Sequence, residues 1–462
     1  MRERLAVVWY FIRARYLQRF RTRKELRRYQ KQRVLRQLAY LKKHSPYFKG
    51  LSVHSFEDFK KLPLMNKQFM MEHFNALNCV GVDRDEALSL AIDSEKQREF
   101  SEKLDGISVG LSSGTSGARG LFLVSDRERA LWAGTVLAKF LPKGRLFGHR
   151  IAFFLRADNN LYETIDSKLI RFRYFDLLKD MTENLSELAA YRPSLLVAPP
   201  SVLLDIARAI ERGEPNIRPE KVISVAEVLR AEDAAYLKAQ FGLQVIHQAY
   251  QCTEGFLGYV CECGNFHLNE ELVLIEREYL DETRFVPIVT DFTRQSQPIV
   301  RYRLNDILVE KKGHCPCGNP ASLIRYIEGR EDDIFYFAGI HRNEGAVFPD
   351  FISRCVIYAE GVKNYKVVQD GSAHVTVCLE RESSDTSAQI RREFARLAEK
   401  MKFHCPEIAF ASYVPDFHRK SGVEKRCVAG SKSDSERVYR GFCVTTIHNT
   451  IDERSSCMRS KS

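Results

Sequence analysis

Residues 107–120 read Ile-Ser-Val-Gly-Leu-Ser-Ser-Gly-Thr-Ser-Gly-Ala-Arg-Gly, an apolar strand-like stretch that runs into a loop rich in glycine and hydroxyl side chains. Glycines let the backbone turn tightly and bring its N–H groups close to a polyphosphate. The hydroxyls supply further donors to phosphate oxygens, and Arg119 supplies a positive charge. The loop is not a P-loop, because no Gly-Lys-Ser/Thr sequence closes it. These residues alone leave open both a nucleotide site and a flexible turn; the candidate phosphate-binding residues are Ser112, Ser113, Gly114, Thr115, Ser116 and Gly117.

Beyond this loop, short apolar runs alternate with segments of helical character, which indicates an α/β domain with a largely parallel sheet. The predicted strands are Ile151–Leu155, Ser194–Ala198, Val222–Val225 and Leu243–His247, and the predicted helices include Glu128–Lys139 and Val202–Arg212. Turn residues and β-branched runs predict mixed strands and loops from about 268 to 330. A further α/β unit is predicted from strands Tyr365–Val368 and His374–Leu379 and helix Thr386–Lys402.

The 462 residues suffice for one large domain and a smaller one. The sequence predicts a basic helical arm at 1–50, with helices continuing to about residue 75 and breaks at Ser45-Pro46 and Leu62-Pro63. A large domain is expected at 51–330, a small mobile domain at 331–427, and a disordered tail at 428–462. No apolar run approaches the roughly 18–20 residues of a membrane-spanning helix. Leu5–Ile12 is too short for one and precedes arginines instead of a signal-peptide cleavage site. We therefore expect a cytoplasmic protein.

Positive charge is concentrated at the start of the chain. Residues 1–50 hold 16 Lys and Arg against two acids, so their net charge is +14, whereas the remaining 55 bases and 58 acids give −3. Apolar residues at positions 8, 11, 12, 17 and 20 could line one helix face. A surface helix with a solvated charged face is the favoured interpretation. The alternative is peripheral contact with an anionic membrane surface or an acidic partner such as a carrier protein.

Three further motifs follow the loop in order. Ala226-Glu227-Val228-Leu229 follows one predicted strand, and Tyr250-Gln251-Cys252-Thr253-Glu254-Gly255 follows the next. The third motif has two parts, Arg301-Tyr302-Arg303-Leu304-Asn305-Asp306 and Glu328-Gly329-Arg330-Glu331-Asp332-Asp333. A carboxylate such as Glu254 is a hard oxygen ligand that suits a Mg²⁺ already bound to phosphates. Each motif alone is weak, since Glu227, for example, could simply be an exposed residue at a helix start.

Together the four motifs resemble the signatures of the adenylate-forming superfamily, which includes acyl-CoA synthetases and the adenylation domains of peptide synthetases. More narrowly, they resemble the phenylacetate–CoA ligase branch, some members of which have no assigned substrate. The resemblance implies a large N-terminal adenylation domain of mixed and parallel sheets flanked by helices, plus a small α+β C-terminal domain on a hinge. Gln251 and Asn305 depart from the pattern, because glycine is usual at both positions.

The resemblance also implies a role for each motif residue. The glycine loop binds the phosphates of ATP, Glu227 lies in the turn that frames the adenine, and Tyr250 stacks on the adenine. Thr253 contacts the α-phosphate and Glu254 helps to hold magnesium. In the last motif, Asp306 accepts hydrogen bonds from the ribose hydroxyls, Arg330 lies beside the ribose and phosphates, and Asp332 marks the hinge.

A lysine on the C-terminal domain completes the machinery in this superfamily. The segment Arg-Lys-Ser-Gly-Val-Glu-Lys-Arg at residues 419–426 loosely resembles the closing basic motif of the superfamily. Lys425 is our first candidate for the lysine and Lys420 the second. A solvated charge run is an equally good interpretation of this segment. The unusual sequence after Cys427 leaves open an altered C-terminal domain.

Two cysteine groups indicate metal binding, since clustered cysteines in a large cytosolic chain point to metal or redox chemistry. Cys261, Cys263 and His267 precede Cys315 and Cys317 by about fifty residues. Thiolates and an imidazole fit tetrahedral Zn²⁺, although reduced, unliganded cysteines are the alternative. Many proteins of the phenylacetate–CoA ligase branch, which the motifs resemble, have a cysteine and a histidine aligned with Cys261 and His267. We therefore predict a structural zinc site of Cys261, His267, Cys315 and Cys317.

The sequence thus predicts an enzyme that uses ATP and Mg²⁺ to activate a carboxylic acid as an acyl-adenylate, releasing pyrophosphate. The acyl group would then pass to CoA, to a carrier-protein thiol or to an amine. The acid pocket is expected near 153–162 and 224–250, where aromatic and apolar residues favour an aryl or hydrophobic acid. A catalytically degenerate nucleotide-binding protein is the alternative. Nucleic-acid binding is not expected, because no recognisable module accompanies the basic arm.

Overall fold

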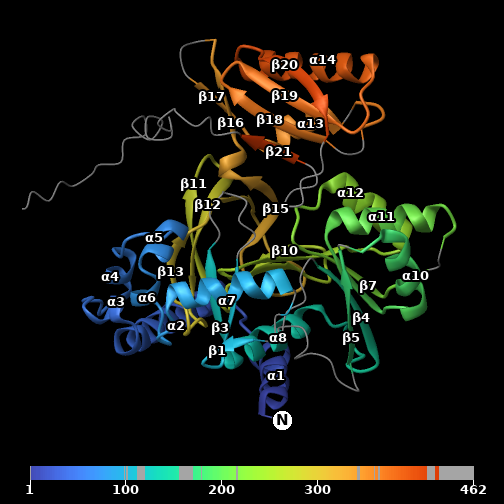
Figure 1. The fold of residues 1–462 in the computed structure, drawn as a ribbon. Helices are drawn as coiled ribbons and strands as arrows, with labels where there is room; N and C mark the ends of the chain where they lie inside the picture. Colours follow the sequence, from blue (N-terminus) through green and yellow to red (C-terminus); the bar gives the residue numbers. More distant parts are fainter. Residues whose placement is uncertain are drawn as a thin grey trace, which may run out of the picture.

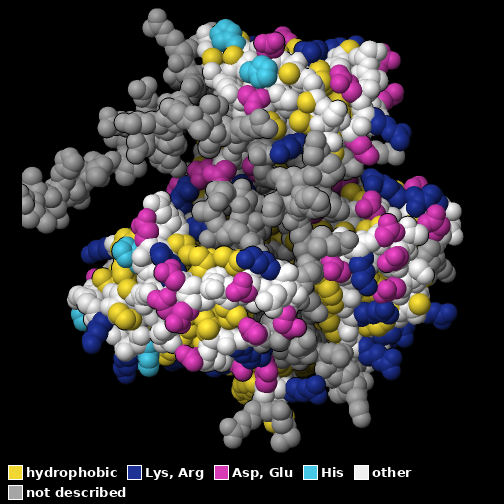
Figure 2. All heavy atoms as spheres, viewed as in Figure 1, with side chains coloured by type: hydrophobic (Ala, Val, Ile, Leu, Met, Phe, Trp, Pro, Cys, Tyr) yellow, Lys and Arg dark blue, Asp and Glu magenta, His cyan; other side chains and the backbone are white. Residues whose placement is uncertain are grey.

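The structure, a computed structural model, describes residues 2–97, 99, 102–111, 120–155, 170–177, 179–214, 217–340, 344–357, 359–362, 365–413 and 422–425. A large body is built around a twelve-stranded mixed sheet, and a small domain with a four-stranded sheet lies above it in Figure 1. In the view of Figure 2, charged side chains of both signs are interspersed over the described surface. Among the described residues, no helix is both long enough and apolar enough to cross a membrane.

Helices dominate the first hundred residues. Long α2 buries Leu26, Val34 and Leu38 against the core, and the side chain of Thr22 caps its first turn by accepting from the Glu25 N–H. The predicted break at Ser45-Pro46 is confirmed, because one helix ends at His44 and the next begins at Pro46. The elements are α1 (Arg2–Ile12), the π-helical turn η1 (Arg13–Leu17), α2 (Arg23–His44), α3 (Pro46–Lys49), α4 (Phe56–Lys60), α5 (Lys67–Glu72), α6 (Phe74–Leu77) and α7 (Arg84–Gln97).

Half of the main sheet is parallel, in the order β5-β4-β6-β7-β8, and helices cover both of its faces. The predicted strand at Leu243–His247 is wrong except for its last residue. Gly242 ends the preceding helix with φ +67°, and Ile246 packs into the helix-covered core before pairing begins. The elements are α8 (Asp126–Phe140), β4 (His149–Leu155), β5 (Ile170–Asp176), α10 (Met181–Tyr191), β6 (Leu195–Ala198), α11 (Pro200–Glu211), β7 (Lys221–Ser224), α12 (Ala231–Phe241) and β8 (His247–Cys252).

Strand β8 joins this parallel half to an antiparallel half, in the order β8-β9-β10-β15-β14-β12-β11. The mixed strands and loops predicted for 268–330 are therefore confirmed. A separate antiparallel sheet of β1 (Lys103–Leu104), β2 (Ile107–Leu111) and β3 (Leu121–Ser125) flanks the glycine loop. The antiparallel half comprises β9 (Gly255–Val260), β10 (Phe266–Leu268), β11 (Val273–Tyr279), β12 (Arg284–Asp291), β13 (Ile299–Arg303), β14 (Asp306–Lys311) and β15 (Leu323–Arg330).

The chain leaves β15 through the 3₁₀ turn η2 (Glu331–Asp333) and enters the small domain, which has its own core around Phe337, Val367 and Phe394. The predicted fold class, a large α/β body with a small α+β domain, is confirmed. The small domain contains β16 (Phe335–Ala338), β17 (Glu344–Val347), α13 (Pro349–Ile357), β18 (Tyr365–Gly371), β19 (His374–Leu379), α14 (Ser384–Met401), β20 (Glu407–Ser412) and β21 (Gly422–Lys425).

Candidate active site

Three residues from separate motifs meet at one edge of the main sheet. Tyr250, near the end of β8, donates a hydrogen bond from its hydroxyl to the Asp306 carboxylate, 2.5 Å away at the start of β14. The Arg330 Nε, at the end of β15, lies 3.7 Å from the other Asp306 oxygen. Burial raises the pKa of Asp306, and burial together with the Asp306 carboxylate raises the pKa of Tyr250. The site lies where the chain passes into the small domain.

The turn between β8 and β9 presents a hydroxyl and a carboxylate at the same edge. The Thr253 hydroxyl donates to Glu254, with 2.9 Å between Oγ1 and Oε2. Burial and the neighbouring Glu254 carboxylate raise the pKa of the Tyr302 hydroxyl, so Tyr302 also faces this turn. Both Thr253 and Glu254 keep partly exposed side chains, which leaves them accessible to a ligand.

Arg294 ties this turn to the strand that follows the glycine loop, and sequence reasoning did not find it. Arg294 is only 9% exposed, and its guanidinium donates to the Thr253 carbonyl (3.1 Å) and the Leu123 carbonyl of β3 (2.8 Å). The buried Glu128 carboxylate supplies the opposite charge and accepts from the backbone N–H of Ser296. Arg294 matches no motif, so only its position in the folded chain reveals its role.

Glu227 lies beyond the end of β7, and its exposed carboxylate accepts from the N–H (3.2 Å) and hydroxyl (3.1 Å) of Ser201 in the first turn of α11. Ala226, the residue before it, has φ +66°. Few non-glycine residues adopt this left-handed conformation, so the turn has a defined, strained backbone. The carboxyl ends of parallel strands are where open α/β sheets bind their ligands.

Both residues that replace the usual glycines make contacts that glycine could not. The Gln251 amide oxygen accepts from the Trp132 indole N–H at 2.7 Å, and β8 is irregular at this position. The Asn305 amide donates to the Asp332 carboxylate at 2.7 Å, which links the last motif to the turn η2. Each departure from the motif pattern therefore adds a side-chain hydrogen bond near the site.

The glycine loop and the candidate lysines lie only partly within the described residues. The phosphate-binding candidates Ser112 to Gly117 lie outside the described residues; the strands on either side pair from Leu111↔Leu121 onward. Lys425 ends β21, which pairs in parallel with β18 and lies against the turn η2. Lys420 lies outside the described residues.

An apolar cavity of about 200 Å³ lies beside this edge, between α8 and the parallel strands. Its lining includes Ala226, next to Glu227, and Gln251, next to Tyr250. None of the described residues that line it carries a charge. The remaining lining residues are Trp132, Val136, Leu137, Phe140, Leu141, Ile151, Phe153, Phe172, Leu195, Val197, Ile223, Val225 and Ala249.

The fold brings together the four predicted metal ligands from the turn after β9, from β10 and from the turn before β15. Their ligand atoms all lie within 4.8 Å of one another, with 3.6 Å between the sulfurs of Cys261 and Cys315. Cys317 Sγ lies 3.4 Å from His267 Nε2. Tetrahedral zinc with Zn–S bonds of about 2.3 Å separates two sulfurs by about 3.8 Å, so these side chains fit the ion. Burial lowers the pKa of His267 to about 4, which keeps its imidazole neutral.

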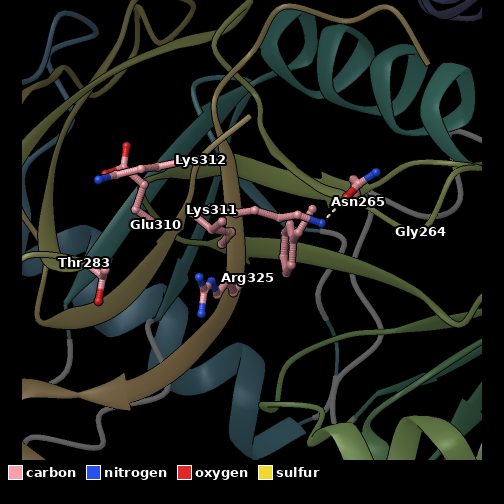
Figure 3. Close-up of a pocket in the computed structure, with 9 residues that line it drawn as sticks. Gly264, Asn265, Thr283, Glu310, Lys311, Lys312 and Arg325 are labelled. Carbon is pink, nitrogen blue, oxygen red and sulfur yellow. Dashed lines mark hydrogen bonds between the residues drawn. The ribbon is translucent and has the colours of Figure 1, made fainter. Parts of the chain in front are cut away.

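A second hollow, of about 610 Å³, opens on the antiparallel half of the sheet close to the cysteines. Figure 3 shows Lys311 reaching across it to the Asn265 amide, with Lys312 and Arg325 nearby. None of the motif residues lines this groove, so it is separate from the candidate active site.

No protein-family model and no curated protein sequence matches the chain. Among solved structures, 2-hydroxyisobutyryl-CoA ligase in the postadenylation state with 2-HIB-AMP gives a TM-score of 0.64 at 14% identity, over 89% of this chain and 90% of that chain. The same ligase with 2-HIB-AMP and CoA in the thioesterification state gives 0.54 at 14% identity, over 93% and 94%.

The amide bond synthetase McbA from Marinactinospora thermotolerans gives a TM-score of 0.51 at 13% identity, over 69% of this chain and 68% of that chain. These similarities show that the chain has the fold of adenylate-forming ligases.

Proposed function

We propose that this protein activates a carboxylic acid with ATP as an acyl-adenylate, releases pyrophosphate, and transfers the acyl group to CoA or a carrier-protein thiol, or to an amine. One observation carries the proposal: Tyr250, Thr253, Glu254, Asp306 and Arg330 gather at one sheet edge, beside an apolar cavity, in the fold of adenylate-forming ligases. The motif pattern resembles that of the phenylacetate–CoA ligase branch, and this resemblance supports the same reaction.

The nucleotide side of the site follows from the placement of the motifs. Asp306 and Arg330 would hold the ribose and phosphates, while Tyr250 and the Glu227 turn would frame the adenine. The glycine loop would hold the phosphates, with N–H and hydroxyl donors from Ser112 to Gly117. ATP brings Mg²⁺, for which Glu254 is the hard carboxylate ligand. Adenylation joins two anions, so its catalysis rests on positioning and on neutralising charge.

The acid side of the site follows from the cavity. An apolar cavity of about 150 Å³ is large enough to hold benzene, and the cavity beside Gln251 measures about 200 Å³. We infer an acid with one aromatic ring or a short apolar chain. A charged substituent on the acid would have no partner among the described lining residues and would lose its hydration.

Lys425 is proposed to supply the cation for adenylation, carried by the small domain. The strand that it ends lies against η2, the turn between the two domains, so a rotation about Asp332 would move it. Departure of the lysine would free the adenylate for attack by the thiol or amine. 2-Hydroxyisobutyryl-CoA ligase, which has a similar fold, has been solved in both a postadenylation and a thioesterification state, which supports a proposal of two steps at one site.

We also propose that Cys261, His267, Cys315 and Cys317 bind one structural Zn²⁺. All four positions of a tetrahedral ion would be filled by protein, which leaves no open position for substrate. The ion would hold the β9–β10 turn to the turn before β15.

ATP–pyrophosphate exchange with a panel of aryl, short-chain, long-chain and amino acids tests the proposed reaction. We expect exchange with aryl or short apolar acids, and its loss in Glu254→Gln, because the amide is a weaker magnesium ligand. Glu282→Gln, which changes an exposed acid outside the site, is the matched control. ATP binding without exchange for any acid would contradict the proposal in favour of a degenerate nucleotide-binding protein.

A further inference from the structure

The N-terminal helix is held firmly to the body through one of its two apolar faces. Val7 is only 6% exposed against α8, and a Cβ added to Gly134 of α8 would lie 2.6 Å from the Val7 carbonyl oxygen. Arg129 pairs with Glu3 at 2.7 Å. Arg15 of η1 donates to the carbonyls of residues 141 and 142, each at 2.8 Å. The helix therefore has a fixed orientation, with one face turned outward.

The outward face is an apolar stripe on the surface, at the end of the molecule opposite the small domain (Figure 1). The described part of the chain has twelve exposed large hydrophobic residues, and six of them fall within positions 5–17. Five are spaced i, i+3, i+4, i+7 and i+11, which places them on one helix face. We call these six residues the outer stripe: Leu5 (64% exposed), Val8 (53%), Trp9 (55%), Ile12 (38%), Tyr16 (47%) and Leu17 (60%).

Basic side chains accompany the outer stripe. Exposed bases near it in the sequence are Arg4, Arg19, Arg21 and Lys24. The two acids of this region are engaged, Glu3 with Arg129 and Glu25 with the backbone N–H of Arg21. Residues 1–50 carry +14, whereas the rest of the chain carries −3. Net positive charge is therefore concentrated in the N-terminal segment that carries the stripe.

We propose that the outer stripe docks in the plane of an anionic phospholipid surface. An interfacial helix buries its apolar residues at the headgroup boundary while arginines contact anionic lipids. Tryptophan and tyrosine favour this boundary, and Trp9 and Tyr16 are both in the stripe. A lipid surface also requires no shape complementarity from the exposed helix face.

Two other occupants suit the outer stripe less well. A second copy would bring a second set of arginines against the first, and like charges repel. An acidic protein would need about 800 Å² of complementary surface per partner. The stripe occupies one face of a single helical segment of 16 residues (Arg2 to Leu17), which is about 24 Å long at 1.5 Å per residue. One helix face of this length is a narrow surface for a protein partner.

Vesicle co-sedimentation of the full chain tests this proposal, using phosphatidylcholine alone and phosphatidylcholine mixed with phosphatidylserine in equal parts. We expect binding to the anionic vesicles only, weakened by salt. Trp9→Ser/Ile12→Ser should reduce binding at least tenfold, whereas Leu64→Ser/Ile340→Ser, a pair of similar exposure elsewhere, should not. Arg19→Gln/Arg21→Gln should lower the affinity for anionic vesicles roughly fivefold per arginine. Lys311→Gln/Lys312→Gln should leave that affinity nearly unchanged.

Circular dichroism and thermal unfolding verify that each variant is folded. We expect each to fold, because the changed residues are exposed. Equal binding to both vesicle types, or unchanged binding of Trp9→Ser/Ile12→Ser, would overturn the proposal. Binding to soluble polyglutamate without vesicle binding would overturn it in favour of an acidic protein partner. A dimer seen by sedimentation velocity, lost in Trp9→Ser/Ile12→Ser and without vesicle binding in the parent, would overturn it in favour of a second copy.

Discussion

At the residue scale, Arg294 is a positioning residue that joins the glycine-loop strand to the Thr253 turn. In Arg294→Lys the charge opposite Glu128 is kept, but one ammonium cannot reproduce the fork that reaches both carbonyls. We expect ATP–pyrophosphate exchange to fall at least tenfold, with a loss of roughly 1–2 kcal/mol in unfolding free energy. Arg208→Lys on the surface of α11 is the control, and undiminished exchange in Arg294→Lys would contradict this role.

Asp291 gives the fold a pH dependence whose sign is set by burial. Burial raises the pKa of Asp291 from 3.8 to about 6, so the native state keeps this proton over a range in which the unfolded chain has lost it. Unfolding free energy should therefore fall as pH rises from about 4 to about 6, by roughly 3 kcal/mol. In Asp291→Asn, Oδ1 can still accept from Thr293. The free energy of unfolding, measured with urea, should therefore exceed that of the parent above pH 6 and differ little from it near pH 4.

Asp281 supplies a control of opposite sign. Although burial opposes the shift, hydrogen bonds from the backbone of Arg284 and Thr283 lower the pKa of Asp281. Above the usual carboxyl pKa, the free energy of unfolding of Asp281→Asn should therefore lie below that of the parent, whereas that of Asp291→Asn should lie above it. Parallel pH profiles for the two variants would contradict the assignment to Asp291.

At the element scale, the proposed zinc ties two turns of the antiparallel half together. Cys317→Ser should lose about one equivalent of zinc by elemental analysis and unfold at a lower temperature, as the parent should after chelation. Binding at a hundredfold excess of free ion over Kd contributes about 2.7 kcal/mol, which is roughly 4 °C in Tm for a domain of about 300 residues. Cys263→Ser is the matched control, because Cys263 is exposed in the β9–β10 turn and outside the cluster. Zinc retained in Cys317→Ser would refute the ligand set.

At the scale of the whole molecule, two arginines of the body hold the small domain in its described orientation. Arg230 lies 5.3 Å from the centre of the Tyr365 ring and donates to the Tyr365 hydroxyl. Arg284 lies 4.5 Å from the Phe348 ring. If adenylation uses this orientation, Arg230→Ala should lower ATP–pyrophosphate exchange about five- to thirtyfold, from the loss of about 1–2 kcal/mol.

Acyl transfer from preformed adenylate should change much less in Arg230→Ala, because that step would use the rotated orientation. Single-turnover assays of the two half-reactions separate these effects, with the exposed Arg212→Ala as control. Equal losses in both half-reactions would show that the contact does not select between orientations.

Most of the fold and of the candidate nucleotide site could be predicted from local sequence patterns. Strand and helix periodicity depends on near neighbours, so β4, β6, β19 and α14 could be predicted within a few residues. The motifs around Tyr250, Asp306 and Arg330 are contiguous in sequence for the same reason. Leu243–His247 was mispredicted because an apolar run has the same composition whether it pairs in a sheet or packs as a connection.

The sequence by itself determined the α/β architecture, the motif residues and the four predicted metal ligands, since each is expressed in short runs of the chain. Only the tertiary structure decided what Arg294 joins, which residues enclose the apolar cavity, and which face of the N-terminal helix stays outside. Each of these depends on contacts between segments far apart in the chain, such as the Arg294 bonds to Thr253, 41 residues away, and to Leu123, 171 residues away. Such contacts exist only after the whole chain has packed, so no local pattern records them.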